Sequence, residues 1–180
     1  MARAIFLDRD GVVCEDTNMF YQGTPLLKPE DFKWIPGSKE ALKLLSNLEF
    51  KVALVTNQSI INKGLLSEEE FLKTNNSLYG EMSKNNINIE RIYYCKHTPK
   101  ENCECRKPKI GLLIQAEKEL GVSLKDCYVI GDKTSDIKMG EDAGCKTILV
   151  KTGYGGRDDS FEVNPDFIMD NLYEAIKILK

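Results

Sequence analysis

The chain has 180 residues, of which 42% are hydrophobic and 29% are charged, a composition typical of a globular domain and unlike that of disordered or fibrous proteins. Its net charge of −3 lacks the basic excess of a general nucleic-acid-binding protein. The apolar run at residues 4–7 ends at Asp8 and is too short for a signal peptide or a membrane span, so we expect a cytoplasmic monomer without a membrane or nucleic-acid partner.

Five short apolar runs recur along the chain, at residues 4–7, 52–55, 92–95, 128–130 and 147–150. Their lengths suit strands that are buried on both faces of a parallel sheet. Helical patterns alternate with these runs. They begin after Ser38 and after the capping-box pair Ser67 and Glu70, and they recur over residues 112–120, 137–143 and 172–179. The alternation predicts a doubly wound α/β fold with its ligand site at the carboxyl ends of the strands.

Two segments interrupt the alternation of strands and helices. Residues 12–36 carry several prolines and a glycine, and we predict that they form a flap over the site. Residues 95–108 hold three of the six cysteines and the only histidine, which predicts a loop stabilised by a metal ion. We find no repeat, low-complexity tract or linker, so residues 1–180 are predicted to form a single domain.

The first predicted strand runs directly into two carboxylates, Asp8 and Asp10, which are separated only by Arg9 and followed by Gly11. Like charges so close together need a counterion. A hard cation such as Mg²⁺ suits oxygen ligands and can also bridge to a substrate phosphate. The alternative is a solvated turn, because Asp and Gly are common turn residues.

Polar residues also follow the later strands. Thr56 and Asn57 come directly after the second run and offer donors suited to phosphate oxygens, although they could instead cap a helix. Arg106 and Lys107 add two cations before Pro108, but cations are common in any sequence. The assignment of a phosphate site therefore depends on a fourth group, the polar residues that follow the fourth apolar run.

That group follows the fourth run, where Asp132 and Asp136 lie four residues apart and could complete a metal site or cap a helix. In chain order, the four groups resemble the haloacid dehalogenase-like phosphohydrolases. The residues that carry the resemblance are Asp8-Arg9-Asp10-Gly11, Thr56, Lys107 and Gly131-Asp132 through Asp136.

The resemblance implies a magnesium-dependent phosphatase that forms an aspartyl-phosphate on Asp8. Asp10 would protonate the leaving oxygen and later act as base toward water. The family pattern further implies which residues bind the metal ion and which bind the phosphoryl group. Mg²⁺ would be bound by Asp8, the backbone carbonyl of Asp10 and Asp132, with Asp136 in the outer coordination sphere, and the phosphoryl group would be held by Thr56, Asn57 and Lys107, next to Arg106.

The cysteine-rich loop has a regular spacing. Cys95 and His97 are separated by one residue, as are Cys103 and Cys105. Four such ligands can close a tetrahedral Zn²⁺ site without leaving a position for water, which predicts a structural role. Reduced buried cysteines or a disulfide remain the alternatives. Because two cations follow this loop directly, zinc is expected to order the segment that aims them at phosphate.

The complete arrangement resembles the D-glycero-D-manno-heptose 1,7-bisphosphate 7-phosphatase subfamily, which includes histidinol-phosphate phosphatase domains and lacks a large cap domain. The resemblance is carried by Thr56-Asn57-Gln58-Ser59 and by the Cys/His loop running into Cys105-Arg106-Lys107-Pro108. Two residues depart from the pattern, Ile60 in place of the usual glycine and Ile110 where proline often precedes Gly111.

The resemblance implies a small phosphorylated metabolite as substrate, with heptose 1,7-bisphosphate losing its 7-phosphate in nucleotide-activated heptose synthesis. Histidinol phosphate is the enzymatic alternative. A basic cleft would favour the bisphosphate, and an acidic contact near the leaving group would favour the cationic amino alcohol. A non-catalytic zinc-bearing binding protein is a third reading, but intact Asp8, Asp10 and Asp132 argue against it.

Two further features have no catalytic assignment. Gly153, Gly155 and Gly156 lack the spacing of a dinucleotide-binding fingerprint, so we expect a flexible loop. Cys14 lies near Asp8 in sequence but has no neighbouring histidine to activate it, so we expect it to pack or to contact the flap.

Overall fold

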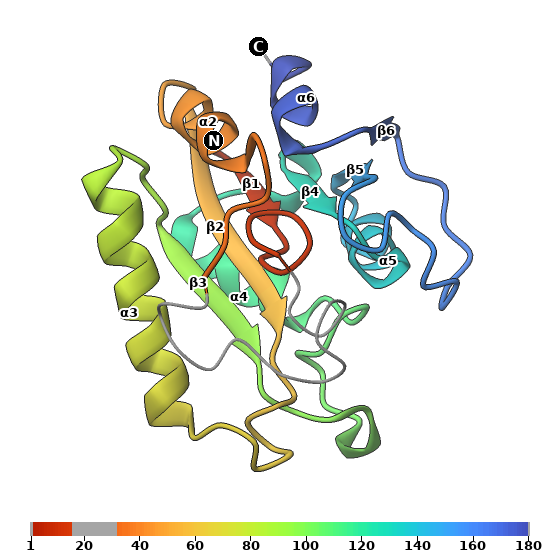
Figure 1. Ribbon diagram of the computed structural model, residues 1–180. Coiled ribbons are helices and arrows are strands. Elements are labelled where there is room, and N and C mark those ends of the chain that lie inside the picture. The colour runs from red at the N-terminus through yellow and green to blue at the C-terminus, as the bar shows by residue number, and fades with distance from the viewer. Residues whose placement is uncertain (1, 16–31, 180) are drawn as a thin grey trace.

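The computed structural model describes residues 2–15 and 32–179, and its centre is a six-stranded sheet (Figure 1). The strand order is β3-β2-β1-β4-β5-β6, and every neighbouring pair is parallel. The strands are β1 (Arg3–Leu7), β2 (Phe50–Asn57), β3 (Arg91–Cys95), β4 (Tyr128–Gly131), β5 (Lys146–Val150) and β6 (Phe167–Met169). The predicted parallel α/β fold is therefore confirmed.

Helices cover both faces of this sheet. They are α2 (Ser38–Leu45), α3 (Glu68–Lys84), α4 (Gly111–Leu120), α5 (Thr134–Asp142) and α6 (Leu172–Lys177), with short 3₁₀ turns η2 (Pro99–Glu101) and η3 (Leu124–Asp126). Helices α2 and α6 lie side by side at one end of the molecule, whereas α4 lies behind the sheet in the view of Figure 1. None of the helices in the described ranges is long and apolar enough to cross a membrane.

The alternation of side chains along β1 divides the core into two layers. Ile5 and Leu7 pack into the layer that includes residues of α2, α3 and α6, whereas Ala4 and Phe6 pack into the layer that includes residues of α4. All four side chains are fully buried, as expected for a central strand whose successive residues face opposite sides. Packing on both faces of the sheet fixes the positions of the carboxyl ends of β1, β2, β4 and β5.

The local signals at the helix ends mostly agree with the structure. The capping box is present, because Ser67 Oγ accepts from the Glu70 amide and Glu70 accepts from the Ser67 amide. The first predicted helix, however, ends at Leu45 rather than continuing to Leu48. The Ser46 hydroxyl and the Asn47 side chain donate to carbonyls four residues earlier, a local competition that favours helix ends.

Strand β6 was not predicted from the sequence. It has only three residues, and Phe167 and Ile168 are exposed on the edge of the sheet, so it carries no buried apolar pattern. The polar segment before it is held by a side chain, since Asp166 accepts hydrogen bonds from the amide and hydroxyl of Thr147 on β5. Edge pairing here depends on a tertiary contact rather than on strand propensity.

The predicted flap is described only at its two ends, since residues 16–31 lie outside the described ranges. The two described ends, residues 12–15 and 32–36, pair with each other. Cys14 pairs with Trp34 through an antiparallel bridge, and the Ile35 amide donates to the Val13 carbonyl. Cys14 is fully buried, in agreement with a packing role.

Candidate active site

Polar side chains from the ends of β1, β2 and β4 and from the loop before α4 converge at one edge of the sheet. They line a small cavity whose walls are Asp8, Asp10, Thr56, Asn57, Lys107, Lys133 and Ser135. Lys107 lies in the loop between β3 and α4, and every other wall residue ends a strand, follows one closely or lies at the start of the next helix. The cavity therefore lies where a doubly wound sheet is expected to bind its ligand.

Three buried carboxylates cluster beside this cavity, and one of them, Asp8, also lines it. Oxygen atoms of Asp8, Asp132 and Asp136 all lie within 4.8 Å of one another. The Lys107 ammonium contacts two of them: its Nζ lies 2.9 Å from Asp8 Oδ1 and also forms an ion pair with Asp136. Lys107 Nζ further donates to the Val55 carbonyl at 2.9 Å, so the cation is fixed from three directions.

The electrostatics of these carboxylates fit a divalent cation. Burial raises the pKa of Asp132 to about 8, with the charges of Asp8 and Asp136 adding to the shift. Burial likewise raises the pKa of Asp8 to about 6, even though Lys107 opposes the shift. Asp132 Oδ1 is buried and has no hydrogen-bond partner among the described residues. Oxygen ligands with excess negative charge and an unpaired atom are the donor set that Mg²⁺ prefers.

The Asp10 side chain is held apart from the three clustered carboxylates. Arg9 Nε donates to Asp10 Oδ1 and Arg9 Nη2 donates to Asp10 Oδ2, both at 3.0 Å. Gln58 Nε2 donates to Asp10 Oδ2 at 2.7 Å. Burial alone would raise the pKa of Asp10, but the charge and hydrogen bonds of Arg9 hold it below its ordinary value. An ionised Asp10 is the form required of a general base.

Arg9 itself is anchored in the core. It is 2% exposed, and its guanidinium lies 5.7 Å from the centre of the Phe71 ring on α3. The ion pair therefore connects the loop after β1 to a helix on the sheet. Because truncating one partner of such a pair leaves a buried charge, both residues are needed together.

Asn57 lines the cavity and also holds the backbone of Lys107. Its Oδ1 accepts from the Lys107 amide at 3.1 Å, and its Nδ2 donates to the Lys107 carbonyl at 3.3 Å. The Asn57 side chain thus clamps the backbone of Lys107, and the Lys107–Pro108 peptide bond that follows is cis. Thr56 lies at the end of the same strand, and its hydroxyl is within 3.5 Å of Asp10 Oδ2.

The glycine-rich segment after β5 forms one wall of the metal site. The Tyr154 amide donates to Asp132 Oδ2 at 2.7 Å, and the Thr152 hydroxyl donates to the Gly11 carbonyl at 2.7 Å. A Cβ atom on either Gly11 or Gly153 would overlap the Asp132 carboxylate. Both glycines have positive φ angles, so their lack of a side chain is needed for conformation and for space.

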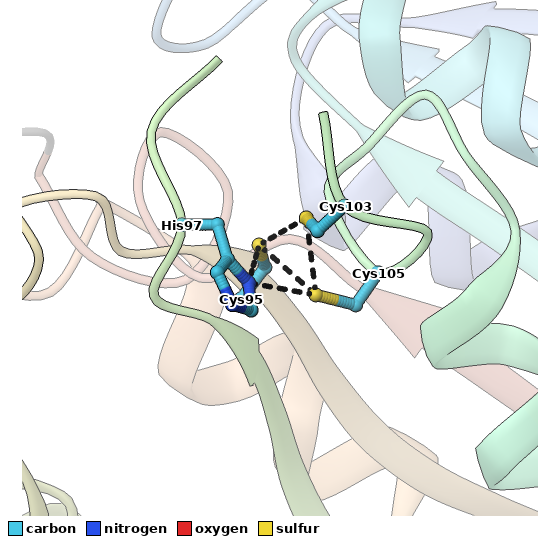
Figure 2. Close-up of side chains that lie close together, drawn as sticks. All are labelled: Cys95, His97, Cys103 and Cys105. Atoms are coloured by element: carbon cyan, nitrogen blue, oxygen red, sulfur yellow. Dashed lines mark hydrogen bonds between the residues drawn. The ribbon is translucent and has the colours of Figure 1, made fainter. Parts of the chain in front are cut away.

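A second candidate metal site lies in the loop between β3 and α4. The side chains of Cys95, His97, Cys103 and Cys105 converge on one another in Figure 2, with sulfur–sulfur distances of 3.3–3.6 Å. His97 Nδ1 lies 3.2 Å from Cys105 Sγ and 3.6 Å from Cys95 Sγ.

These distances distinguish between the alternatives for the cysteine cluster. A disulfide has its sulfurs at about 2.05 Å, whereas donors about 2.3 Å from a common tetrahedral centre lie at separations close to those observed. All three cysteines are free thiols in the structure. Burial raises the pKa of the Cys95 thiol, so a bound cation is what would keep this sulfur ionised. Three sulfurs and one nitrogen fit Zn²⁺.

This cluster contacts the candidate active site through Arg106. The guanidinium of Arg106 donates from Nη1 to the His97 carbonyl at 3.1 Å. The loop also packs tightly on α4, because the Gly111 amide donates to the Glu104 carbonyl and a side chain at Gly111 would overlap that carbonyl. The conformation of the cysteine loop therefore determines where Arg106 lies.

An open groove of about 590 Å³ continues from the small cavity between the cysteine loop and the segment after β5. Its charged lining residues are Arg106, Lys107, Lys109, Lys133 and Asp158. Asp158 accepts hydrogen bonds from the amide and hydroxyl of Thr134, at 2.8 and 2.7 Å. Four cations and one carboxylate therefore line the groove, but two of the cations are already paired, Lys107 with Asp8 and Asp136 and Lys109 with Glu104. The lining has an excess of cations that these ion pairs partly offset.

The structure adds functional candidates that sequence reasoning missed. Arg9 and Gln58 hold Asp10, and the segment of Gly153 and Tyr154 encloses Asp132. One signal was available for the glycine segment. It directly follows a predicted strand, and all carboxyl ends of a parallel sheet lie on the same edge. The positions of Lys133 and Ser135 in the cavity had the same signal, since both closely follow Asp132 after a predicted strand.

Comparison with known proteins agrees with this geometry. Residues 104–175 match a family model described as HAD-hydrolase-like. The chain is 36% identical over 187 residues to the D-glycero-beta-D-manno-heptose-1,7-bisphosphate 7-phosphatase of Haemophilus influenzae, covering 100% of this chain and 98% of that protein. It is also 36% identical to the D-glycero-alpha-D-manno-heptose-1,7-bisphosphate 7-phosphatase of Campylobacter jejuni, covering 99% and 96%.

A solved structure is similar over nearly the same length. The D,D-heptose 1,7-bisphosphate phosphatase of B. bronchiseptica, in complex with magnesium and phosphate, superimposes with a TM-score of 0.88 at 27% identity. The match covers 99% of this chain and 98% of that one. The similarity thus includes every strand end described above.

Proposed function

The chain belongs to the haloacid dehalogenase-like phosphatases, in the family of the D-glycero-D-manno-heptose 1,7-bisphosphate 7-phosphatases, and from this premise we propose that it hydrolyses the 7-phosphate of that sugar. The observation that carries the proposal is the convergence of Asp8, Asp132, Asp136 and Lys107 beside Asp10 and Thr56. This arrangement supports phosphoryl transfer to a carboxylate.

In the first step, Asp8 attacks the phosphorus atom of the substrate. Asp8 Oδ1 accepts from the Arg9 amide at 2.7 Å and pairs with Lys107, so we assign the attack to the other carboxylate oxygen, Oδ2. A bond forms between Asp8 and phosphorus while the bond from phosphorus to the sugar oxygen breaks. Lys107 and the Thr56 hydroxyl stabilise the charge on the phosphoryl oxygens.

Asp10 completes the proton transfers of both steps. Because Arg9 lowers the pKa of Asp10, its carboxylate must first take up a proton from solvent as the substrate binds. It donates this proton to the departing sugar oxygen, and the carboxylate then takes a proton from the water that attacks the phosphoaspartate. That second attack releases inorganic phosphate and restores Asp8. Arg9 keeps the carboxyl group of Asp10 close to the cavity throughout.

We assign the two metal sites to different ions. Asp8, Asp132 and the backbone carbonyl of Asp10 would hold Mg²⁺, with Asp136 outside them, and this ion neutralises the phosphoryl charge when bound. Cys95, His97, Cys103 and Cys105 would hold Zn²⁺ in a closed structural site. The zinc site affects substrate binding indirectly, because it fixes the His97 carbonyl to which the Arg106 guanidinium donates.

The charge of the groove supports a bisphosphate rather than a cationic substrate. Four basic side chains line it against one carboxylate, Asp158, although Lys107 and Lys109 are already paired with carboxylates that do not line the groove. A second phosphate at the far end of a sugar would meet Arg106 and Lys109 there. Histidinol phosphate would instead bring an ammonium group toward these cations, which costs affinity.

The proposed biochemistry suits a cytoplasmic enzyme, because a reducing compartment keeps the cysteine cluster available for zinc. We also predict that the protein is a monomer. Size-exclusion chromatography with light scattering tests it.

A substrate panel tests the proposed function. Initial rates are measured in Mg²⁺ for both anomers of heptose 1,7-bisphosphate, fructose 1,6-bisphosphate, histidinol phosphate and p-nitrophenyl phosphate. The heptose bisphosphates should give the largest kcat/KM. Relatives of equal identity act on different anomers, so both must be included. A larger kcat/KM for histidinol phosphate would overturn the assignment, and no turnover of any member would overturn the proposal as a whole.

A further inference from the structure

Gln58 lies just beyond the end of β2, and its amide side chain reaches into the catalytic site. The residue is 5% exposed, and its backbone amide donates to the Cys95 carbonyl at 2.7 Å, which fixes its position. Its Nε2 donates both to Asp10 Oδ2 at 2.7 Å and to Thr56 Oγ1 at 2.9 Å. One side-chain nitrogen therefore connects the proton-transfer group to the phosphate-binding hydroxyl.

The chemistry of the partners fixes the direction of these hydrogen bonds. Asp10 Oδ2 also accepts from Arg9 Nη2 at 3.0 Å, so this oxygen is an acceptor and the nitrogen of the Gln58 amide must face it. The same nitrogen then donates its second hydrogen to Thr56. Because Thr56 Oγ1 accepts from Gln58, its own hydrogen is available for donation. In the structure this hydroxyl lies 3.5 Å from Asp10 Oδ2, a long contact that a bound phosphoryl oxygen can replace. Phosphoryl oxygens only accept, so Gln58 gives Thr56 the polarity that binding the phosphoryl group requires.

Arg9 cannot replace this function. The guanidinium holds both oxygens of Asp10, and its Nη1 donates to Asn75 Oδ1 on α3 at 3.5 Å. Without Gln58, Arg9 would thus orient the Asp10 carboxyl group only with respect to α3. Gln58 orients it with respect to the residue that grips the phosphoryl group, without adding a charge.

We propose that Gln58 is a positioning residue, which fixes the Asp10 carboxyl group and the Thr56 hydroxyl relative to each other. When Thr56 binds the phosphoryl group, Asp10 then faces the leaving oxygen. The inference rests on the proposed phosphatase mechanism. It assigns Gln58 a part in leaving-group protonation, a step that sugar phosphates need because an alkoxide is a poor leaving group.

The test compares two classes of substrate in Gln58→Met and Gln58→Glu. Methionine keeps the length of the side chain without a donor, and glutamate keeps its shape but replaces the donor with an acceptor. For each protein, kcat/KM is measured with the preferred sugar phosphate and with p-nitrophenyl phosphate, whose leaving group departs without a proton. The matched control is Gln115→Met, an exposed glutamine on α4 that donates to Glu119.

The ratio of the two kcat/KM values is the diagnostic quantity. Both Gln58 variants should lower it by about 10-fold to 100-fold, a part of the ~10²–10⁴-fold effect of a positioned acid, and the control should leave it unchanged. The Gln58→Glu variant preserves packing, so it decides the outcome if Gln58→Met does not fold. Equal losses for both substrates, or no loss, would overturn the inference. Failure of the wild-type protein to hydrolyse any sugar phosphate would instead overturn the proposed function.

Discussion

Replacing Gly153 by alanine is expected to weaken magnesium binding without unfolding the protein. The added Cβ would overlap Asp132 Oδ2 and lie 2.8 Å from the Gly11 Cα, so the carboxylate, the segment after β5, or both must move. Movement of that segment also loosens the hydrogen bond from the Tyr154 amide to Asp132, now 2.7 Å long. Loss of support for a metal ligand typically costs about 10-fold to 100-fold in metal affinity.

A matched control separates this effect from backbone strain. Gly144 has a φ angle of +73° and Gly153 one of +56°, but a Cβ at Gly144 meets no atom within 4 Å. Both alanine variants should therefore lose roughly 1–2 kcal/mol of stability from the left-handed conformation. Only Gly153→Ala should change the metal site.

The assay is a magnesium titration of each variant, by calorimetry and by initial rates with p-nitrophenyl phosphate. Thermal unfolding measures the loss of stability in parallel. The expected result is a higher Mg²⁺ dissociation constant for Gly153→Ala and a wild-type value for Gly144→Ala. If both variants bind Mg²⁺ equally well, the segment after β5 does not support Asp132 and the reasoning is wrong.

Three further predictions concern the proposed catalytic and zinc residues. Asp8→Asn should abolish turnover while leaving thermal unfolding nearly unchanged, because an amide has the shape of the carboxylate but is a poor nucleophile; normal turnover would reject the covalent mechanism. Asp10→Asn should lower kcat/KM for a sugar phosphate by about 10²–10⁴-fold, and a rate close to wild type would remove Asp10 from the acid role. The wild-type protein should contain about one equivalent of zinc by elemental analysis, and Cys103→Ser should lose it. That variant should keep its circular dichroism spectrum but bind phosphate more weakly; retained zinc would contradict the ligand assignment, and unchanged kinetics would contradict the coupling to Arg106.

The fold and the positions of the main site residues could be predicted because one geometric rule connects them. Parallel strands end at the same edge of a sheet, so Asp8 and Asp132 were expected to meet although 124 positions separate them in the sequence. Buried apolar runs located the five strands that carry a core pattern. The three-residue β6 has no such pattern and pairs through a tertiary contact.

The partners of individual polar side chains could not be predicted in the same way. The sequence shows that Asn57 and Gln58 follow a strand, but it does not show which acceptors lie within reach. In the structure Asn57 binds the backbone of Lys107, and Gln58 binds Asp10. The glycine segment was interpreted by its spacing alone, so its closeness to Asp132 was missed.

The central strand has a consequence for how the protein folds during synthesis. β1 leaves the ribosome before the other strands of the sheet, yet it is paired on one side with β2 and on the other with β4, which begins 121 residues after β1 ends. Until then, an apolar strand lacks one neighbour, and Asp8 cannot meet Asp132. Such distant pairing slows folding and leaves the nascent chain exposed to aggregation. Truncated translation products that end before β4 would thus contain the nucleophile but no place to bind its metal.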